Sequence, residues 1–157
     1  MRILVVDDDA SVLNACCSWL IEEGCEVSTL RSPGRVLSCV RSTRAEMVLI
    51  DPLMVNLSDE ELRVLLTSCA HAGAPGVVLH SKLTPQLLSV VVDIRHARGV
   101  IKKSESAAEF LPAFRELAMH AWTRPAGARS GTHRIGDVAP VGGELVVLPL
   151  AGSSRRQ

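Results

Sequence analysis

Short apolar runs alternate with helix-like segments along this chain of 157 residues, and this alternation constrains the fold more than any other feature. The runs end at charged or turn residues and are too short to cross a bilayer. Such an alternation predicts parallel strands that are joined by crossover helices. The expected strands are Arg2–Val6, Glu26–Leu30, Met47–Ile50, Val77–Leu79 and Gly99–Lys102.

The segments between these strands carry the boundary signals of helices. Gly24 is placed to end the first helix, and Ser58 with Glu61 and Ser106 with Glu109 form capping boxes. Two other segments open with a hydroxyl residue followed by proline, a combination typical of a first helical turn. The expected helices are Ala10–Glu23, a helix beginning at Ser32-Pro33, Ser58–Gly73, Thr84–His96 and Ser106–Trp122.

The composition of the strands also predicts their order in the sheet. The first, third and fourth runs are apolar throughout, which is typical of strands covered on both faces. The second run alternates with polar residues and the fifth ends in lysines, so both suit an edge. Right-handed crossovers then give the order 2-1-3-4-5. The expected fold is therefore α/β, a flavodoxin-like, doubly wound, five-stranded parallel sheet with five helices.

The overall composition excludes several classes of protein. Apolar residues make up 47% and charged residues 22%, with a formal net charge of zero, so no nucleic-acid or membrane surface is expected. The sequence from Met1 to Val6 shows no signal-peptide pattern, and the five cysteines form no metal-binding motif. We expect a cytoplasmic protein with reduced thiols.

The composition changes after Trp122. Residues 123–157 contain six of the eleven glycines, three of the eight prolines and five arginines. We expect a Gly/Pro/Arg-rich, largely flexible C-terminal tail, too short and glycine-rich for a helix-turn-helix domain. Within it, Glu144–Leu150 is apolar enough to form either a short extra strand or a docking peptide.

Polar side chains that suit phosphate chemistry follow four of the predicted strands. Asp7, Asp8 and Asp9 follow the first strand, Asp51 follows the third, and a hydroxyl and a lysine follow the fourth and fifth. Because parallel strands end at one rim, these groups are expected to meet. Buried carboxylates repel one another unless a hard divalent cation lies among them. The pattern predicts metal-dependent phosphoryl transfer, with Asp51 as nucleophile.

At this point the chain resembles a known family, the receiver domain of bacterial two-component response regulators, of the chemotaxis-response-regulator type. The resemblance covers residues 1–122 and rests on Val5–Asp8, Asp51–Met54, Ser81 and Gly99–Ser104. Asp51 and Ser81 are 30 positions apart, and Ser81 and Lys103 are 22 positions apart, which is the family's usual spacing.

The resemblance implies a role for each of these residues. Asp51 would be the phosphoacceptor, Ser81 the switch hydroxyl and Lys103 the lysine that contacts the phosphoryl group. The implied ligands of Mg²⁺ are Asp7, Asp8, Asp51 and the backbone carbonyl of Leu53.

The same resemblance implies the function. The chain would be a single-domain response regulator, a phosphorylation-dependent signalling switch that accepts a phosphoryl group from a histidine kinase or a histidine phosphotransfer protein. It would catalyse only its own phosphotransfer and dephosphorylation, and would bind neither nucleic acid nor membrane directly.

Several positions depart from the family pattern. Lys82 replaces a small residue after the switch hydroxyl, Val100 replaces the aromatic switch residue, and Val55 and Asp59 replace a proline and a glycine. These departures support an alternative, a pseudo-receiver that acts as an interaction module without phosphorylation. A remote alternative is a haloacid-dehalogenase-type phosphohydrolase, with Asp7 as nucleophile and Asp9 as acid/base.

Two further questions concern the register of the fourth strand and the helix surfaces. Counting from Pro75 would put His80 at the switch position, but we favour Ser81. On the first helix, Leu13, Cys17 and Ile21 form a second apolar stripe, either a docking surface for a phosphodonor protein or a wide core face.

The fourth predicted helix is apolar nearly all round from Leu87 to Ile94. With the fifth strand and fifth helix it is expected to form a face for a homodimer or a target protein. Burial under Glu144–Leu150 is the competing explanation.

Overall fold

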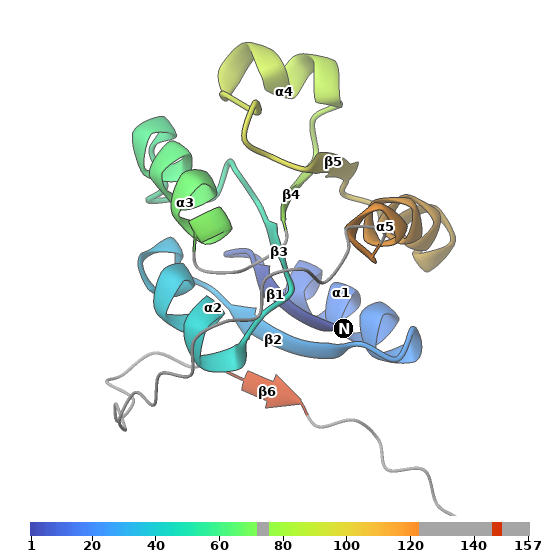
Figure 1. The fold of residues 1–157 in the computed structure, drawn as a ribbon. Coiled ribbons are helices and arrows are strands. Elements are labelled where there is room, and N and C mark those ends of the chain that lie inside the picture. Colours follow the sequence, from blue (N-terminus) through green and yellow to red (C-terminus); the bar gives the residue numbers. More distant parts are fainter. Residues whose placement is uncertain (72–75, 123–145, 149–157) are drawn as a thin grey trace, which may run out of the picture.

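The computed structural model describes residues 1–71, 76–122 and 146–148 (Figure 1). Five parallel strands lie in the order β5-β4-β3-β1-β2, and a sixth strand, β6, extends the sheet beside β2. The predicted flavodoxin-like fold with order 2-1-3-4-5 is confirmed. The strands are β1 (Arg2–Val6), β2 (Glu26–Leu30), β3 (Met47–Ile50), β4 (Val77–Ser81), β5 (Gly99–Lys102) and β6 (Val146–Leu148).

Helices cover both faces of the sheet (Figure 1). One face packs against α1 and α5 through Leu20, Phe110 and Phe114, and the other packs against α2, α3 and α4 through Leu66 and Leu88. Alternate residues of each central strand enter the two cores, as a strand buried on both sides requires. The helices are α1 (Ala10–Glu22), η1 (Pro33–Arg35), α2 (Val36–Thr43), α3 (Asp59–His71), α4 (Pro85–Val91) and α5 (Ala107–Trp122).

Local chemistry explains most helix boundaries. The Asp9 carboxylate accepts a hydrogen bond from Ser11 N at 2.8 Å and caps α1, and Gly24 takes a φ of +75° just after that helix. The predicted capping box before α3 is confirmed, since Glu61 accepts from Ser58 N at 2.8 Å. Ser32 makes no side-chain cap, and the chain enters α2 through the 3₁₀ turn η1.

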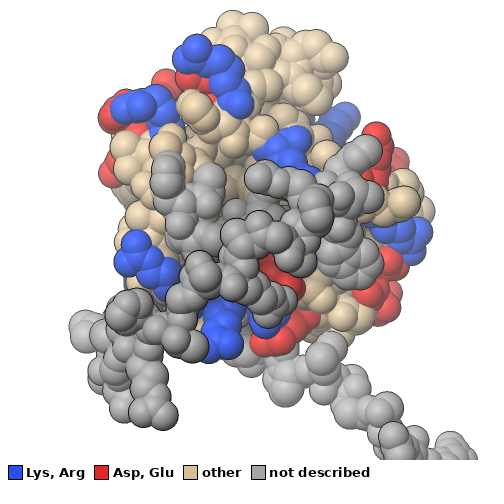
Figure 2. Space-filling view, in the orientation of Figure 1, with Lys and Arg blue, Asp and Glu red and all other residues tan. Residues whose placement is uncertain are grey.

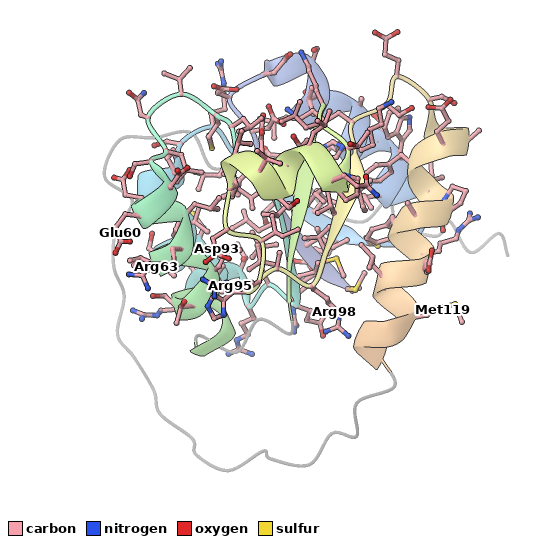
Figure 3. All side chains as sticks on the ribbon, turned by 90° about the horizontal axis from the view of Figure 1, so that it is seen from above. Glu60, Arg63, Asp93, Arg95, Arg98 and Met119 are labelled. Atoms are coloured by element: carbon pink, nitrogen blue, oxygen red, sulfur yellow. The ribbon has the colours of Figure 1, made fainter. Side chains whose placement is uncertain are left out.

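Helix α4 is shorter than the sequence predicted. We expected it to reach His96, but it ends at Val91, and Val92 is extended with φ −137° and ψ 141°. Val92 is buried in the core beside the sheet, and Asp93 forms an ion pair with Arg95 that holds the following turn (Figure 3). Burying Val92 requires the chain to leave the helix, which the apolar pattern alone did not reveal.

Strand β6 runs antiparallel to β2, with Val146 opposite Thr29 and Leu148 opposite Val27. The predicted extra strand in the 144–150 segment is thus confirmed, and it covers the β2 edge. The competing explanation, that this segment buries α4, is wrong for residues 146–148, because β6 lies at one edge of the sheet and α4 contacts β5 at the other (Figure 1). The expected flexibility of the tail at 123–145 and 149–157 lies outside the described residues.

The second apolar stripe of α1 belongs to the core. Leu13 and Cys17 are each 5% exposed and pack with the α1–α5 cluster, while Ile21 is half-buried beside it. These side chains therefore form a wide core face, and the alternative of a docking surface is wrong for Leu13 and Cys17. No helix in the described part of the chain is long and apolar enough to cross a membrane.

Candidate functional site

The polar groups of the predicted site meet at the carboxyl rim of the sheet. Backbone hydrogen bonds extend the sheet pairing to this rim: Asp51 N donates to Val6 O at 2.9 Å, and Lys103 N donates to Ser81 O at 2.7 Å. Asp7, Asp51 and Lys103 are each the first residue after a strand, β1, β3 and β5 respectively. The strand ends therefore fix the positions of these side chains.

Lys103 joins the two buried carboxylates of the site. Its Nζ lies 2.6 Å from Asp7 Oδ2 and 2.7 Å from Asp51 Oδ2. The Lys103 side chain is 8% exposed and the Asp7 side chain 1% exposed, so water screens these charges weakly. Apart from this contact with Lys103, Asp7 Oδ2 accepts no hydrogen bond from another group in the described part of the chain. This oxygen keeps lone pairs for a further ligand.

Burial and pairing act in opposite directions on these groups. Burial raises the pKa of the Asp7 carboxyl, and the contacts with Lys103 and Asp9 N offset only part of that rise. Burial lowers the pKa of the Lys103 ammonium, but its bonds to Asp51 and Asp7 more than offset this, so the pKa is raised. Lys103 therefore stays charged, while the site as a whole holds more negative than positive charge.

The carboxylates form a cluster suited to a hard cation. Oxygen atoms of Asp7, Asp8 and Asp51 all lie within 4.8 Å of one another. The backbone orients two of these side chains, since Leu53 N donates to Asp51 Oδ1 at 2.8 Å and Val55 N donates to Asp8 Oδ2 at 2.9 Å. These three carboxylates are hard oxygen donors, and the oxygen of Asp7 has lone pairs left for a ligand, so the cluster fits Mg²⁺.

His80 and Ser81 point to different environments. His80 lies in the α1–α5 core, where its ring is 5.5 Å from that of Phe110 and its Nδ1 is 4.0 Å from Cys16 Sγ. Ser81 Oγ accepts a hydrogen bond from Leu83 N at 3.2 Å, at the end of β4. His80 is thus part of the core on one face, and successive strand residues point to opposite faces.

Replacing His80 with leucine is expected to stabilise the protein in acid. Burial lowers the pKa of His80 to about 4, so its contribution to stability is present above pH 6.5 and is lost as the pH falls toward 4. The loss is on the order of 3 kcal/mol. Urea unfolding of His80→Leu should show a smaller fall in the free energy of unfolding between pH 6.5 and 4. An identical fall in both proteins would contradict this assignment.

The structure also places the residues that depart from the family pattern. Lys82 is exposed, and Val100 is half-buried against the α2–α4 core. Sequence reasoning missed Asn56, which takes a left-handed φ of +67° in the β3–α3 loop, a conformation that asparagine tolerates. Sequence reasoning also missed Arg31, which contacts Asp8. The signal that could have revealed it is a basic residue directly after β2, the strand that pairs with β1.

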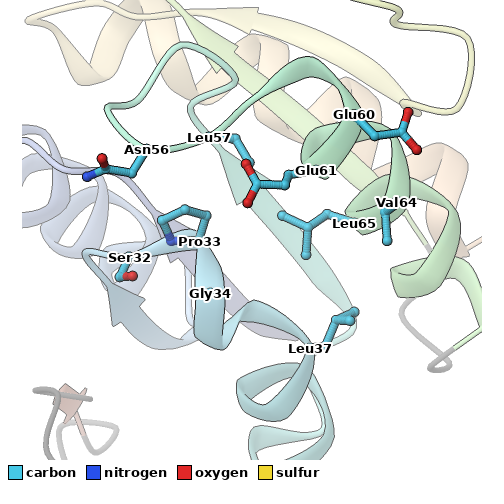
Figure 4. A pocket seen from close by; sticks show the side chains of 10 residues that line it. All are labelled: Ser32, Pro33, Gly34, Leu37, Asn56, Leu57, Glu60, Glu61, Val64 and Leu65. Carbon is cyan, nitrogen blue, oxygen red and sulfur yellow. The ribbon is translucent and has the colours of Figure 1, made fainter.

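A groove of about 440 Å³ lies away from the carboxylate cluster, between η1 and α3 (Figure 4). Pro33, Leu57 and Leu65 give it an apolar floor, and Glu61 at its rim is already bonded to Ser58. Glu60, which also lines the groove, is paired with Arg63, so both of its acidic side chains are already engaged.

Comparisons with known proteins agree with this fold. No protein-family model matches the chain. It is 33% identical over 81 residues to the DNA-binding response regulator MtrA of Mycobacterium tuberculosis and of Mycobacterium leprae. The match covers 52% of this chain and 35% of MtrA, so the chain spans about a third of the length of these relatives.

Solved structures match over most of the chain. The chemotaxis response regulator CheY4 of Vibrio cholerae superposes with a TM-score of 0.63 at 17% identity, covering 74% of this chain and 97% of CheY4. The resemblance to receiver domains is confirmed. The response regulator TrrA of Thermotoga maritima, solved in complex with Mg²⁺-BeF, matches with a TM-score of 0.62 at 22% identity over 74% of this chain and 97% of TrrA. These likenesses establish the receiver fold.

Proposed function

We propose that this chain is a phosphorylation-dependent signalling switch of a two-component phosphorelay, with Asp51 as the phosphoacceptor. The observation that carries the proposal is the Lys103 ammonium held between Asp7 and Asp51, beside a cluster of three carboxylates. Residues 1–122 would form the receiver domain and residues 123–157 its tail. The phosphodonor would be a histidine kinase or a histidine phosphotransfer protein.

The proposed reaction is a displacement at phosphorus. An Asp51 oxygen attacks the phosphoryl group of a phosphohistidine; the new P–O bond forms as the P–N bond breaks, and the leaving imidazole takes up a proton. Asp7, Asp8, Asp51 and the Leu53 carbonyl would hold Mg²⁺, which supplies charge neutralisation when bound. The Lys103 ammonium and the Ser81 hydroxyl would each bond a phosphoryl oxygen and stabilise its charge.

The decisive experiment measures phosphorylation of the purified chain by acetyl phosphate, read by intact mass. A single phosphoryl adduct is expected that needs Mg²⁺ and is absent from Asp51→Asn, because the amide is a poor nucleophile. An adduct that persists in Asp51→Asn would contradict Asp51 as phosphoacceptor. A folded chain that binds no Mg²⁺ and gains no adduct would instead support the pseudo-receiver, which Val100 in place of an aromatic switch residue favours.

The phosphohydrolase alternative loses support from the geometry. Its acid/base would be Asp9, but the Asp9 carboxylate accepts bonds from Ser11 N and Ser11 Oγ and caps α1. These hydrogen bonds lower the pKa of Asp9, so the carboxyl is ionised at neutral pH and holds no proton to donate to a leaving group. The proposed function is therefore signalling and not the turnover of a metabolite.

The output would pass through the face formed by α4, β5 and α5. Leu87, Val90 and Val91 of α4 are 56%, 81% and 49% exposed. Met119 of α5 is 68% exposed but lies apart from α4 (Figure 3). Figure 2 shows the surface above α4 as a broad area of uncharged residues. Exposed apolar side chains grouped in this way are typical of a protein-binding surface.

Val90→Glu is expected to weaken association through this face without unfolding the chain, because Val90 is the most exposed of these residues. Size-exclusion chromatography with light scattering, with and without phosphorylation, measures the change. Val55→Glu is the matched control, since Val55 is 70% exposed but lies in the β3–α3 loop. Equal association of the two variants would contradict a partner face on α4.

A further inference from the structure

A second cation lies at the rim of the site, beside Asp8. Arg31 follows the last residue of β2, and its Nη2 donates a hydrogen bond to the main-chain oxygen of Asp8 at 2.9 Å. The preceding residue, Leu30, accepts a hydrogen bond from Asp7 N at 3.1 Å. Consecutive residues at the end of β2 thus hold consecutive residues at the end of β1, and the guanidinium is fixed next to the carboxylate cluster.

The positive charge of Arg31 is not neutralised by the acidic residues nearby. Within residues 1–71, 76–122 and 146–148 its side chain forms no ion pair, and its hydrogen bond goes to a carbonyl. A guanidinium carries five N–H donors, and the side chain is exposed, so most of its donors face solvent at the rim. Arg31 is therefore available to an incoming anion.

Lys103 is in the opposite situation. It is buried, and its ammonium is shared between Asp7 and Asp51. An anion at the rim can therefore pair with Arg31 without displacing a carboxylate partner, which it would have to do at Lys103. Because Asp8 Oδ2 is separately held by Val55 N, the carboxylate of Asp8 has its own support and does not rely on Arg31 for its orientation.

We infer that Arg31 is a substrate-positioning residue that pairs with the phosphoryl group of an incoming donor at the rim of the site. The inference rests on the proposed function and adds a residue to its site. The planar guanidinium can pair with two oxygens of one phosphate, and acetyl phosphate is the donor that tests this. In the transfer, Asp51 forms the new P–O bond, the bond between phosphorus and the acyl oxygen breaks, and acetate leaves.

The test compares initial rates of phosphorylation over a range of acetyl phosphate concentrations for the full chain and four variants. Arg31→Met is expected to raise the half-saturating concentration about three- to tenfold with little change in the maximal rate, because a rim charge acts mainly on association. Arg31→Lys should recover part of the loss. Arg41→Met, which removes an exposed arginine of α2, should match the wild type. Asp51→Asn gives the background.

A second measurement separates recognition from structural support. Calorimetric titration with Mg²⁺ should give the same affinity for Arg31→Met and the wild type. The inference would be overturned if Arg31→Met had the same half-saturating concentration of acetyl phosphate as the wild type. It would also be overturned by a lower maximal rate together with weaker Mg²⁺ binding. Either result would leave the proposed function intact. A wild-type chain that gains no phosphoryl group from saturating donor would overturn the proposed function, and the role of Arg31 with it.

Discussion

Lys103→Met is expected to lower the free energy of unfolding by about 3 kcal/mol at pH 7, because it leaves buried carboxylates without their cation. Asp7 and Asp51 both contact the Lys103 ammonium, and water screens the three charges weakly. Part of the loss should return with Mg²⁺, which replaces the missing positive charge, and part in acid, where Asp7 takes up a proton. Phosphorylation by acetyl phosphate should slow about a hundredfold.

Urea unfolding followed by circular dichroism, with EDTA or with Mg²⁺, measures the effect. Lys102→Met is the matched control, because Lys102 is adjacent, carries the same charge and is exposed. If the two variants unfolded at the same urea concentration, the buried pairing would contribute nothing to stability. If Mg²⁺ gave Lys103→Met no extra stability beyond that of the wild type, the cation and the ammonium would not share the same carboxylates.

The site could be predicted from the sequence because its parts follow directly from strand ends. Asp51 and Lys103 come within one residue of β3 and β5, and a parallel sheet brings such ends to one rim. The order of the strands followed from their composition for the same reason, since only a strand covered on both faces is apolar throughout. Where the position of a side chain depends only on where a strand ends, the alternation of apolar runs and helical segments was sufficient to predict it.

The features that were missed depend on tertiary contacts. Val92 leaves the helical conformation to reach the core, so α4 ends before the apolar pattern does. Leu13 and Cys17 were not missed, since a wide core face was one of the two interpretations of this stripe, and the close packing of α1 on the sheet decides for it. Arg31, at the end of β2, reaches the backbone of Asp8 at the end of the neighbouring β1, a contact between side chain and backbone that no spacing rule describes.

Asp7→Asn is expected to stabilise the chain at neutral pH by about 1 kcal/mol while weakening Mg²⁺ binding about tenfold or more. The Asp7 carboxyl is fully buried, and burial raises its pKa above the ordinary value of 3.8. A carboxyl with a raised pKa contributes stability that is present below pH 3.8 and is lost as the pH rises through its folded pKa. Without metal, the ionised form at pH 7 therefore opposes folding, and the neutral amide removes this cost.

The wild type and Asp7→Asn should accordingly converge in stability as the pH falls toward 4 in EDTA, and separate as it rises toward 7. His80 titrates in this range with the opposite sign, but it is present in both proteins and cancels in the difference. Saturating Mg²⁺ should reverse the order of stability at pH 7, because only the wild type keeps the full set of carboxylate ligands.

Asp59→Asn is the control for these measurements, because it changes an exposed acidic residue of α3. A wild type that was the more stable protein in EDTA at pH 7 would show that the Lys103 pairing outweighs the burial of Asp7. The acidic cluster would then be a structural element, with no stability given up for metal binding.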